Sequence, residues 1–110
     1  MKILVIESMK TPRVKEIDSS LESMQKEVDG YIQAIYPFED SVALICNEEG
    51  KILGLPLNRA LRDENGEIYD IICGTFFLCS ALPDEESFSS LSDEQIKHFS
   101  KLYQNPELFL

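Results

Sequence analysis

Residues 2–7 read Lys-Ile-Leu-Val-Ile-Glu, and no other stretch says more about the class of fold. A nearly unbroken apolar run of this length is typical of a β-strand that is covered on both faces or lies centrally in a sheet. Shorter apolar or alternating runs between turn signals predict further strands. These runs cover residues 13–17, 31–36, 42–46, 51–55, 68–72 and 75–80.

The connections between these strands are predicted from their turn residues. Residues 47–50, Asn-Glu-Glu-Gly, are interpreted as a hairpin connection between strands 42–46 and 51–55, with a positive φ at Gly50. Asn65-Gly66 predicts a type I′ turn, in which both residues have positive φ. Residues 57–62 are the least strand-like part of this region and predict a helical turn.

Two helices are predicted from capping signals followed by apolar residues at helical spacing. The first covers about residues 20–29, with Ser19 and Glu22 as a capping box and Gly30 just past its end. The second follows a capping box of Ser92 and Gln95 and ends before Pro106. The sequence therefore predicts an α+β fold. It has a mostly antiparallel sheet of about five to seven strands, one helix after the second strand and one C-terminal helix, with the helices on one face.

Length and composition indicate one domain, residues 1–110, with an α+β core at 1–82 followed by an acidic loop and a helix at 83–110. The net charge of −10 argues against direct contact with nucleic acid phosphates or with anionic membranes. We expect no membrane segment and no signal peptide. The three cysteines, at 46, 73 and 79, predict free, partly buried thiols and a cytoplasmic location.

No catalytic or metal-binding pattern emerges from the reactive side chains. The only histidine, His98, is expected at the surface of the second helix rather than beside a nucleophile. The cysteines do not form a C-x-x-C pair, so zinc is not expected, and Asp63–Gly66 lacks the following ligands of a calcium loop. The sequence therefore predicts no enzyme and no cofactor.

One candidate binding site rests on two of the three arginines. Arg59 and Arg62 lie in one short window, and paired guanidinium groups suit carboxylates and phosphates. We expect a ligand-binding site formed by Asn58, Arg59, Arg62, Gly74 and Thr75, with Gly74 giving access to the backbone. The alternative is that both arginines form surface ion pairs with Asp63, Glu64 or Glu67.

The middle of the chain resembles the domain of unknown function 3846 family. The motifs that carry the resemblance are Gly-Tyr-Ile at 30–32, Cys-Asn-Glu-Glu-Gly-Lys at 46–51, Gly-Leu-Pro-Leu-Asn-Arg at 54–59 and Ile-Tyr-Asp-Ile-Ile-Cys-Gly-Thr-Phe at 68–76. The resemblance covers about four-fifths of the chain, and the helix after Leu82 is less typical. It implies a protein of Gram-positive bacteria, their phages or mobile elements, and hence a role in countering host defence.

These observations lead to two functional hypotheses. In the first, the chain is a non-catalytic protein that sequesters a small anionic, nucleotide-like ligand, with Tyr31, Tyr36 or Tyr69 stacking on a base. In the second, its acidic surface makes it an inhibitor of a host protein or a mimic of nucleic acid. A homo-oligomer is expected in addition, with the apolar tail at 108–110 as an interface element.

Overall fold

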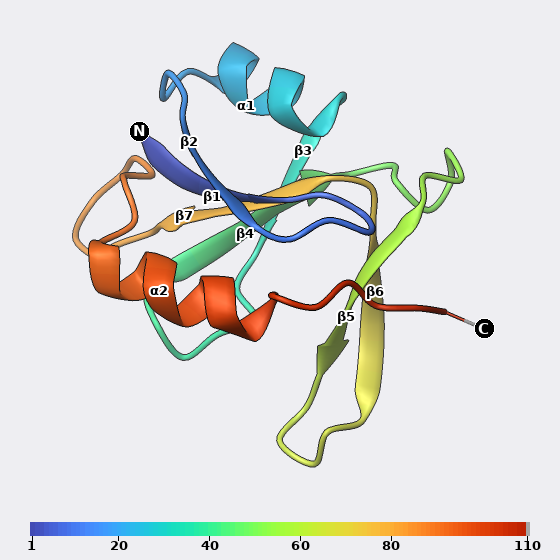
Figure 1. The fold of residues 1–110 in the computed structure, drawn as a ribbon. Helices are drawn as coiled ribbons and strands as arrows, with labels where there is room; N and C mark the ends of the chain where they lie inside the picture. The colour runs from blue at the N-terminus through green and yellow to red at the C-terminus, as the bar shows by residue number, and fades with distance from the viewer. Residues whose placement is uncertain (110) are drawn as a thin grey trace.

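The structure is a computed structural model that describes residues 1–109 (Figure 1). Within these residues the chain forms seven strands and two helices in the order β1–β2–α1–β3–β4–β5–β6–β7–α2. The strands are β1 (Lys2–Ile6), β2 (Arg13–Glu16), β3 (Ile32–Ile35), β4 (Val42–Asn47), β5 (Leu57–Arg62), β6 (Ile68–Cys73) and β7 (Phe76–Ser80). The helices are α1 (Leu21–Val28) and α2 (Asp93–Leu102). The predicted α+β class is confirmed.

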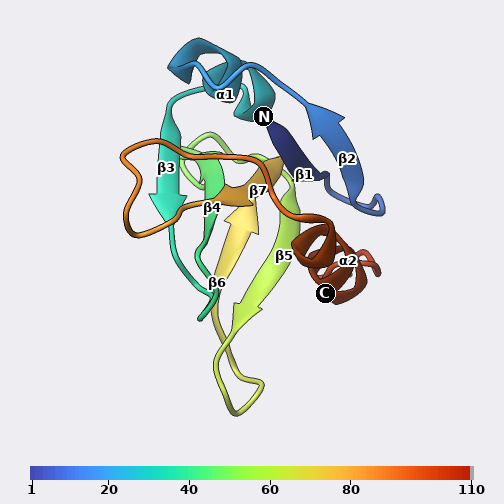
Figure 2. The same ribbon diagram turned by 90° about the vertical axis from the view of Figure 1, so that its left-hand side faces the viewer.

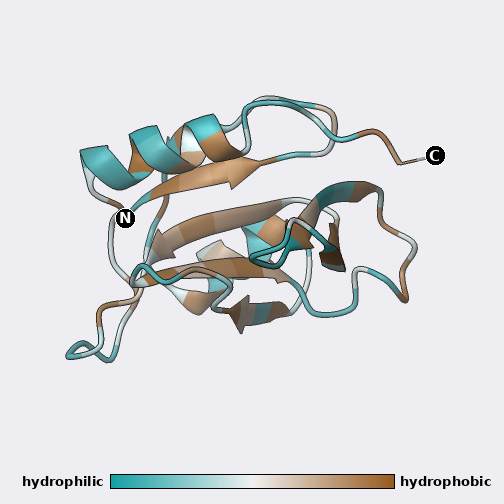
Figure 3. Cartoon of the chain, turned by 90° about the horizontal axis from the view of Figure 1, so that it is seen from below, coloured by the Kyte–Doolittle hydropathy of each residue, from teal (hydrophilic) through white to brown (hydrophobic). Residues whose placement is uncertain are grey.

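Five strands form one antiparallel sheet in the order β2–β1–β7–β4–β3, and β5 and β6 form a separate antiparallel pair. The central strands are buried on both faces, since every residue of β4 and β7 and residues 3–6 of β1 are buried. This burial explains why their sequences are apolar without alternation. In Figure 3 the strands are accordingly brown over most of their length, whereas the helices mix brown with teal.

The two faces of the large sheet carry separate apolar cores, and the helices lie on opposite faces (Figures 1 and 2). Met24 and Val28 of α1 pack on Val5 and Phe77 on one face. On the other face, Phe99 of α2 packs in the core that includes residues of both β5 and β6. The expectation that both helices cover one face is therefore wrong. Two-sided burial of the central strands requires a covering layer on each side.

The start of α2 follows the predicted signal, whereas both ends of α1 are shifted by one residue. The Ser92–Gln95 capping box of α2 is present, as expected. At α1 the N-cap is Ser20, whose hydroxyl accepts from the Ser23 amide, so the capping box predicted at Ser19 does not form. The left-handed residue that ends α1 is Asp29, with φ of 58°, rather than Gly30. Gly30 instead lies against Asn47, whose side chain would meet any Cβ there.

The region between β4 and β6 differs most from the prediction. Residues 57–62 form strand β5 rather than a helical turn, and residues 51–55 form turns rather than a strand. Gly50 has no positive φ; it is a site of close packing, where an added Cβ would lie 2.6 Å from the Cys73 carbonyl oxygen. We call the β5–β6 hairpin the arm. Its outer half projects away from the large sheet (Figure 1).

The tip of the arm is held by a side chain rather than by a type I′ turn. Only Gly66 of the Asn65-Gly66 pair has a positive φ, of 80°. The Asp63 carboxylate accepts from the amides of Asn65 and Glu67, both at 2.9 Å. Short polar side chains commonly cap turns in this way, so Asp63 replaces the second left-handed residue.

Candidate binding site on the arm

The predicted site residues separate into an interior group and a surface group. Asn58 is fully buried, and its side-chain amide donates to the carbonyls of Ile6 and Gly74, both at 2.9 Å. It thereby ties the start of β5 to the end of β1 and to the turn that links β6 with β7. The structure brings Asn58 and Gly74 together, but inside the protein.

Arg59 is also in the interior, with a relative exposure of 1%. Its Nη1 donates to Asn58 O and Oδ1, at 3.3 and 2.9 Å. Its Nη2 donates to the carbonyls of Lys10 and Tyr103, at 2.8 and 3.0 Å. Burial lowers the pKa of its guanidinium, and its Nε has no hydrogen-bond acceptor within residues 1–109. Arg59 therefore joins three segments and brings a positive charge below the surface.

Arg62 is the arginine that reaches the surface, and it holds a carboxylate. Its two terminal nitrogens donate to the two oxygens of Glu107, at 3.0 and 3.1 Å. The same carboxylate accepts from the backbone amide of Ala60 at 3.1 Å. The expected partners Asp63, Glu64 and Glu67 are not the ones that bind the arginines. An ion pair does form, but with a residue 45 positions away.

Burial alone would raise the pKa of Glu107, but the surrounding donors outweigh it. Hydrogen bonds from Arg62 and the Ala60 amide, together with the positive charges of Arg62 and Arg59, leave the pKa of this carboxyl below its ordinary value. Two hydrogen-bond donors of β5, the Arg62 side chain and the Ala60 amide, and the positive charge of Arg59 thus act on one carboxylate, that of Glu107. This arrangement, a planar guanidinium fork plus a backbone amide, is a general means of binding carboxylate or phosphate oxygens.

These groups line a hollow of about 210 Å³ between the arm and the end of α2. Its charged residues are Arg59, Arg62 and Glu107, so its formal charge is +1 in a chain of net charge −10. Three aromatic residues also line the hollow: Phe38, exposed Tyr69 and buried Tyr103. The hollow therefore combines a local positive charge with an exposed aromatic ring.

Gly74 and Thr75 lie outside this hollow. Gly74 adopts a φ of 86° between β6 and β7, and an added Cβ would lie 2.7 Å from the Leu55 side chain. The backbone is thus closely approached, as predicted, but by the chain itself. Thr75 lines a different, polar hollow beside Arg13 and Lys15, where Glu7 and Glu27 balance the basic groups.

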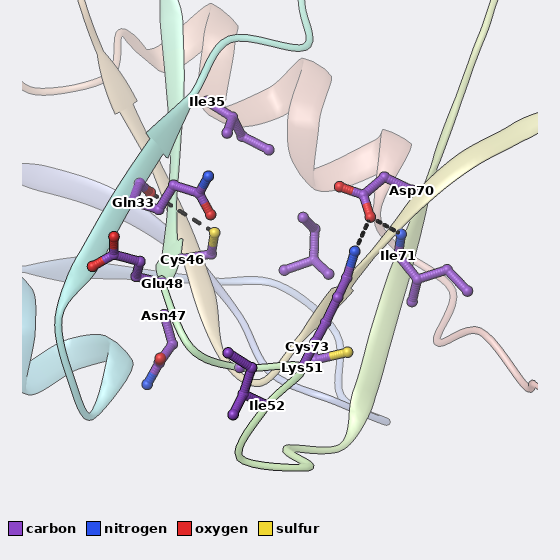
Figure 4. A pocket seen from close by; sticks show the side chains of 12 residues that line it. Gln33, Ile35, Cys46, Asn47, Glu48, Lys51, Ile52, Asp70, Ile71 and Cys73 are labelled. Atoms are coloured by element: carbon purple, nitrogen blue, oxygen red, sulfur yellow. Dashed lines mark hydrogen bonds and ion pairs between the residues drawn. The ribbon is translucent and has the colours of Figure 1, made fainter.

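A second hollow, of about 320 Å³, lies on the other side of the arm, between β6 and strands β3 and β4 (Figure 4). Lys51 crosses its mouth and pairs with Asp70, whose carboxylate also accepts from the Ile71 amide at 2.8 Å. Cys46 and Cys73 point into this region (Figure 4). Burial raises the pKa of the Cys46 thiol to about 11, so it carries little thiolate at neutral pH.

One backbone amide on each strand of the arm is therefore capped in the same way, by a carboxylate that also binds a cation. The register pairs Ala60 with Ile71, and the outward amides of this pair donate to Glu107 and Asp70. Each carboxylate is held in turn by a cation, Arg62 or Lys51. A two-stranded sheet offers unpaired amides on both sides, and carboxylates that cap them oppose the addition of another strand.

The histidine and the cysteines are distributed over four elements. His98 is exposed on α2, while the three cysteines are buried in β4, β6 and β7. Burial also raises the pKa of Cys79, to about 12. Within residues 1–109, no three His, Cys, Asp or Glu side chains are grouped so that they could hold a metal ion. In the same part of the chain, neither helix is long and apolar enough to cross a membrane.

Sequence reasoning identified Arg62 and missed Glu107, Tyr103 and the Ala60 amide. Glu107 lies in the tail after α2, far from β5 in the sequence, and the tail was considered only for its apolar end. The sequence offers one signal for Glu107, because it is a single carboxylate between Pro106 and the apolar Leu108. The role of this carboxylate follows only from the fold, in which α2 ends beside β5.

The structure is thus a small antiparallel α+β protein with a basic hollow beside a two-stranded arm. A family model with the description "Domain of unknown function (DUF3846)" matches residues 1–104, and the chain belongs to this family. The match extends through α2, so the C-terminal helix is part of the family domain rather than an addition to it. No curated protein and no solved structure matches the chain.

Proposed function

We propose that this chain is a non-catalytic binding protein that takes the anionic group of a small ligand at Arg62 and the Ala60 amide. The observation that carries the proposal is the position of Glu107, whose carboxylate already fills this site with both oxygens. A carboxylate from the chain occupies the place that a ligand carboxylate or phosphate would take. The site thus has the donors of an anion site and an occupant that can be exchanged.

Glu107, which occupies the site, belongs to a tail that few hydrogen bonds join to the rest of the protein. Residues 104–109 form no helix or strand. Beyond Gln104, the hydrogen bonds that join the described tail to the rest of the chain are those of Glu107. An exposed ion pair of this kind contributes about 0.2–1 kcal/mol, so a ligand anion with additional contacts can displace it.

The positive charge of Arg59, buried below the hollow, favours a ligand anion with a higher charge than a carboxylate. Arg59 adds a buried positive charge that carbonyl dipoles stabilise without neutralising it. Tyr69, exposed beside Arg62, offers a ring for stacking, whereas Tyr31 and Tyr36 lie outside the hollow. A nucleotide whose phosphate replaces Glu107 and whose base stacks on Tyr69 fits this arrangement. The hollow is smaller than most ligand pockets, so the tail would move to admit the base.

The biological setting of the proposal comes from the family resemblance. Sequestration of a nucleotide in the host cytoplasm, by a phage or mobile-element protein that counters host defence, requires affinity and no turnover. Assembly into a homo-oligomer stays a prediction. Leu108 is exposed, as an interface residue would be, while Leu110 lies outside the described residues.

Calorimetric titration with adenosine and uridine monophosphates tests this function, with inorganic phosphate and adenosine as single-component controls. We expect saturable binding of the nucleotides, a loss of at least tenfold in affinity in Arg62→Ala, and no change in Arg13→Ala. Arg13 is a suitable control because it is an exposed arginine that pairs with Glu7 elsewhere on the surface. Equal affinity in wild type and Arg62→Ala would contradict the proposal.

A further inference from the structure

The arm carries apolar side chains that the fold leaves exposed. Leu57, Ile68 and Tyr69 are 44%, 51% and 58% exposed, and together with Leu55 they line a shallow hollow of about 510 Å³. The adjoining turn exposes Ile52 and Leu53, at 85% and 58%. We call these six residues the arm surface. It adjoins the anion site at Tyr69, but its other members take no part in that site.

The position of the arm explains why Ile68 and Tyr69 stay exposed. Burial along β6 increases from Ile68, which is exposed, to Ile72 and Cys73, which are buried in the body of the protein. The tip of the hairpin extends past the large sheet (Figure 1), so Ile68 and Tyr69 are exposed, whereas Ala60 and Leu61 on the neighbouring strand are buried. Exposed apolar side chains that gather in one place mark interaction sites, whereas scattered ones need no explanation.

The stretches of chain next to the arm surface are rich in carboxylates that have no ion-pair partner among the described residues. Its two cations, Lys51 and Arg62, are already paired with Asp70 and Glu107. Five exposed carboxylates flank the arm surface in sequence without an ion-pair partner in the described chain: Glu48, Glu49, Asp63, Glu64 and Glu67. The arm surface thus consists of exposed apolar side chains next to acidic stretches of the chain, with Lys51 and Asp70 also lining its hollow.

We propose that the arm surface is the docking site for a protein segment with an apolar centre flanked by lysine and arginine. Charge complementarity selects this occupant. A second copy of the chain would bring the same five carboxylates and a net charge of −10 against its equal. Anionic lipid headgroups are repelled for the same reason.

The geometry also determines how the segment binds. On each edge of the arm one backbone amide, that of Ala60 or Ile71, is capped by a carboxylate, whereas the arm surface offers exposed apolar side chains. The segment therefore docks by side chains on the face of the hairpin, as an amphipathic helix does in an apolar groove. This inference does not depend on ligand binding at the anion site, because the arm surface shares only Tyr69 with that site.

A labelled, 18-residue synthetic peptide with leucine at helical spacing and lysine elsewhere is the probe. Two relatives of it serve as controls, one with glutamate in place of lysine and one with serine in place of leucine. Fluorescence anisotropy against the full chain is expected to show saturable binding of the leucine–lysine peptide, and at least tenfold weaker binding of both controls. Equal binding of the serine–lysine peptide would mean that charge alone attracts it, and would overturn the proposal.

Matched variants locate the site. The double variant Leu57→Ser, Ile68→Ser is expected to weaken binding of the leucine–lysine peptide at least tenfold. The control Val14→Ser, Leu21→Ser removes two equally exposed apolar residues elsewhere and is expected to change it less than twofold. Likewise, Glu64→Gln with Glu67→Gln is expected to weaken binding, and Glu85→Gln with Glu86→Gln is not.

Two results would contradict the assignment. One is equal loss of binding in the arm and control variants. The other is a wild-type dimer in sedimentation that Leu57→Ser, Ile68→Ser converts to monomer, since the occupant would then be a second copy. All substituted side chains are exposed, and urea unfolding of each variant verifies that the fold is intact.

Discussion

Arg59 is a charged side chain that the fold uses as a cross-link. Its guanidinium donates to the loop after β1, to its neighbour in β5 and to the end of α2. Removing it leaves buried carbonyl oxygens without donors, and such unsatisfied groups cost more than the bonds themselves contribute.

We therefore expect Arg59→Lys to lower the free energy of unfolding by about 3 kcal/mol. Lysine has a single nitrogen on a flexible stem and cannot bridge the carbonyls of Lys10 and Tyr103 in the same way. Urea unfolding measures the change. Arg13→Lys, at an exposed pair with Glu7, is the control and is expected to change stability by no more than about 0.5 kcal/mol. Equal changes in the two variants would refute the cross-link.

The thiols provide a second prediction for single residues. Cys46 and Cys79 are buried, and burial raises the pKa of both, to about 11 and about 12. Alkylation by iodoacetamide at pH 8, followed by peptide mapping, is expected to leave both unmodified in the folded protein and to modify both in urea. Rapid modification of either residue without urea would show that its strand opens.

The sequence identified which residues are chemically unusual but not what they contact. Arg59 and Arg62 were predicted to act as a pair, yet one lies inside the protein and the other binds a carboxylate from the tail. Spacing along the chain predicted local partners, because only local distances can be estimated without a fold. Whether a buried arginine binds a ligand or the backbone depends on long-range packing.

Among the elements, the arm depends most on glycine. Gly74 combines a positive φ with an approach of the Leu55 side chain, whereas Gly66 has a positive φ and open space around it. We expect Gly66→Ala to cost about 1 kcal/mol from backbone strain alone, and Gly74→Ala about 2–3 kcal/mol because Leu55 must also move. Urea unfolding compares the two. A smaller loss at Gly74 would mean that Leu55 moves freely.

The capped edges of the arm predict a dependence of stability on pH. The pKa values of Glu107 and Asp70 are lowered in the folded chain, so these carboxylates stabilise the fold above their ordinary pKa. This contribution is lost as the pH falls from about 4 toward the lowered values. We expect the variant Glu107→Gln, Asp70→Asn to be less stable than wild type at pH 7, by roughly 1 kcal/mol, and nearly equal to it at pH 2.5. A constant difference at both values would contradict this account.

The strands and helices with strong local sequence signals were predicted, and those with weak signals were not. The central strands and α2 were located from apolar runs and from the capping box at Ser92. Strand β5 was missed because Leu57–Arg62 mixes apolar and basic residues and contains two register irregularities. Residues 51–55 were predicted as the hairpin partner of strand 42–46, whereas β4 pairs with β3 and β7, and β5 pairs with β6 across the tip at Asn65-Gly66.

For the whole molecule, the continuous apolar character of residues 2–7 implied a strand covered on both faces, and the structure has a layer on each face. What the sequence did not indicate is that one of these layers includes the arm as well as a helix. The arm brings β5 against the tail after α2 and so creates the basic hollow. A site that depends on segments 45 residues apart has no signature in local spacing.

The central claim is that Glu107 occupies an exchangeable anion site on β5, and the amide of Ala60 reports on it directly. Nuclear magnetic resonance of ¹⁵N-labelled protein, titrated with adenosine monophosphate, follows this amide as the tail is displaced. We predict a saturating shift of the Ala60 signal in wild type, saturation at roughly fivefold lower nucleotide in Glu107→Gln, and no shift in Arg62→Ala. An Ala60 signal that does not respond in wild type, or that responds equally in Arg62→Ala, would contradict the account.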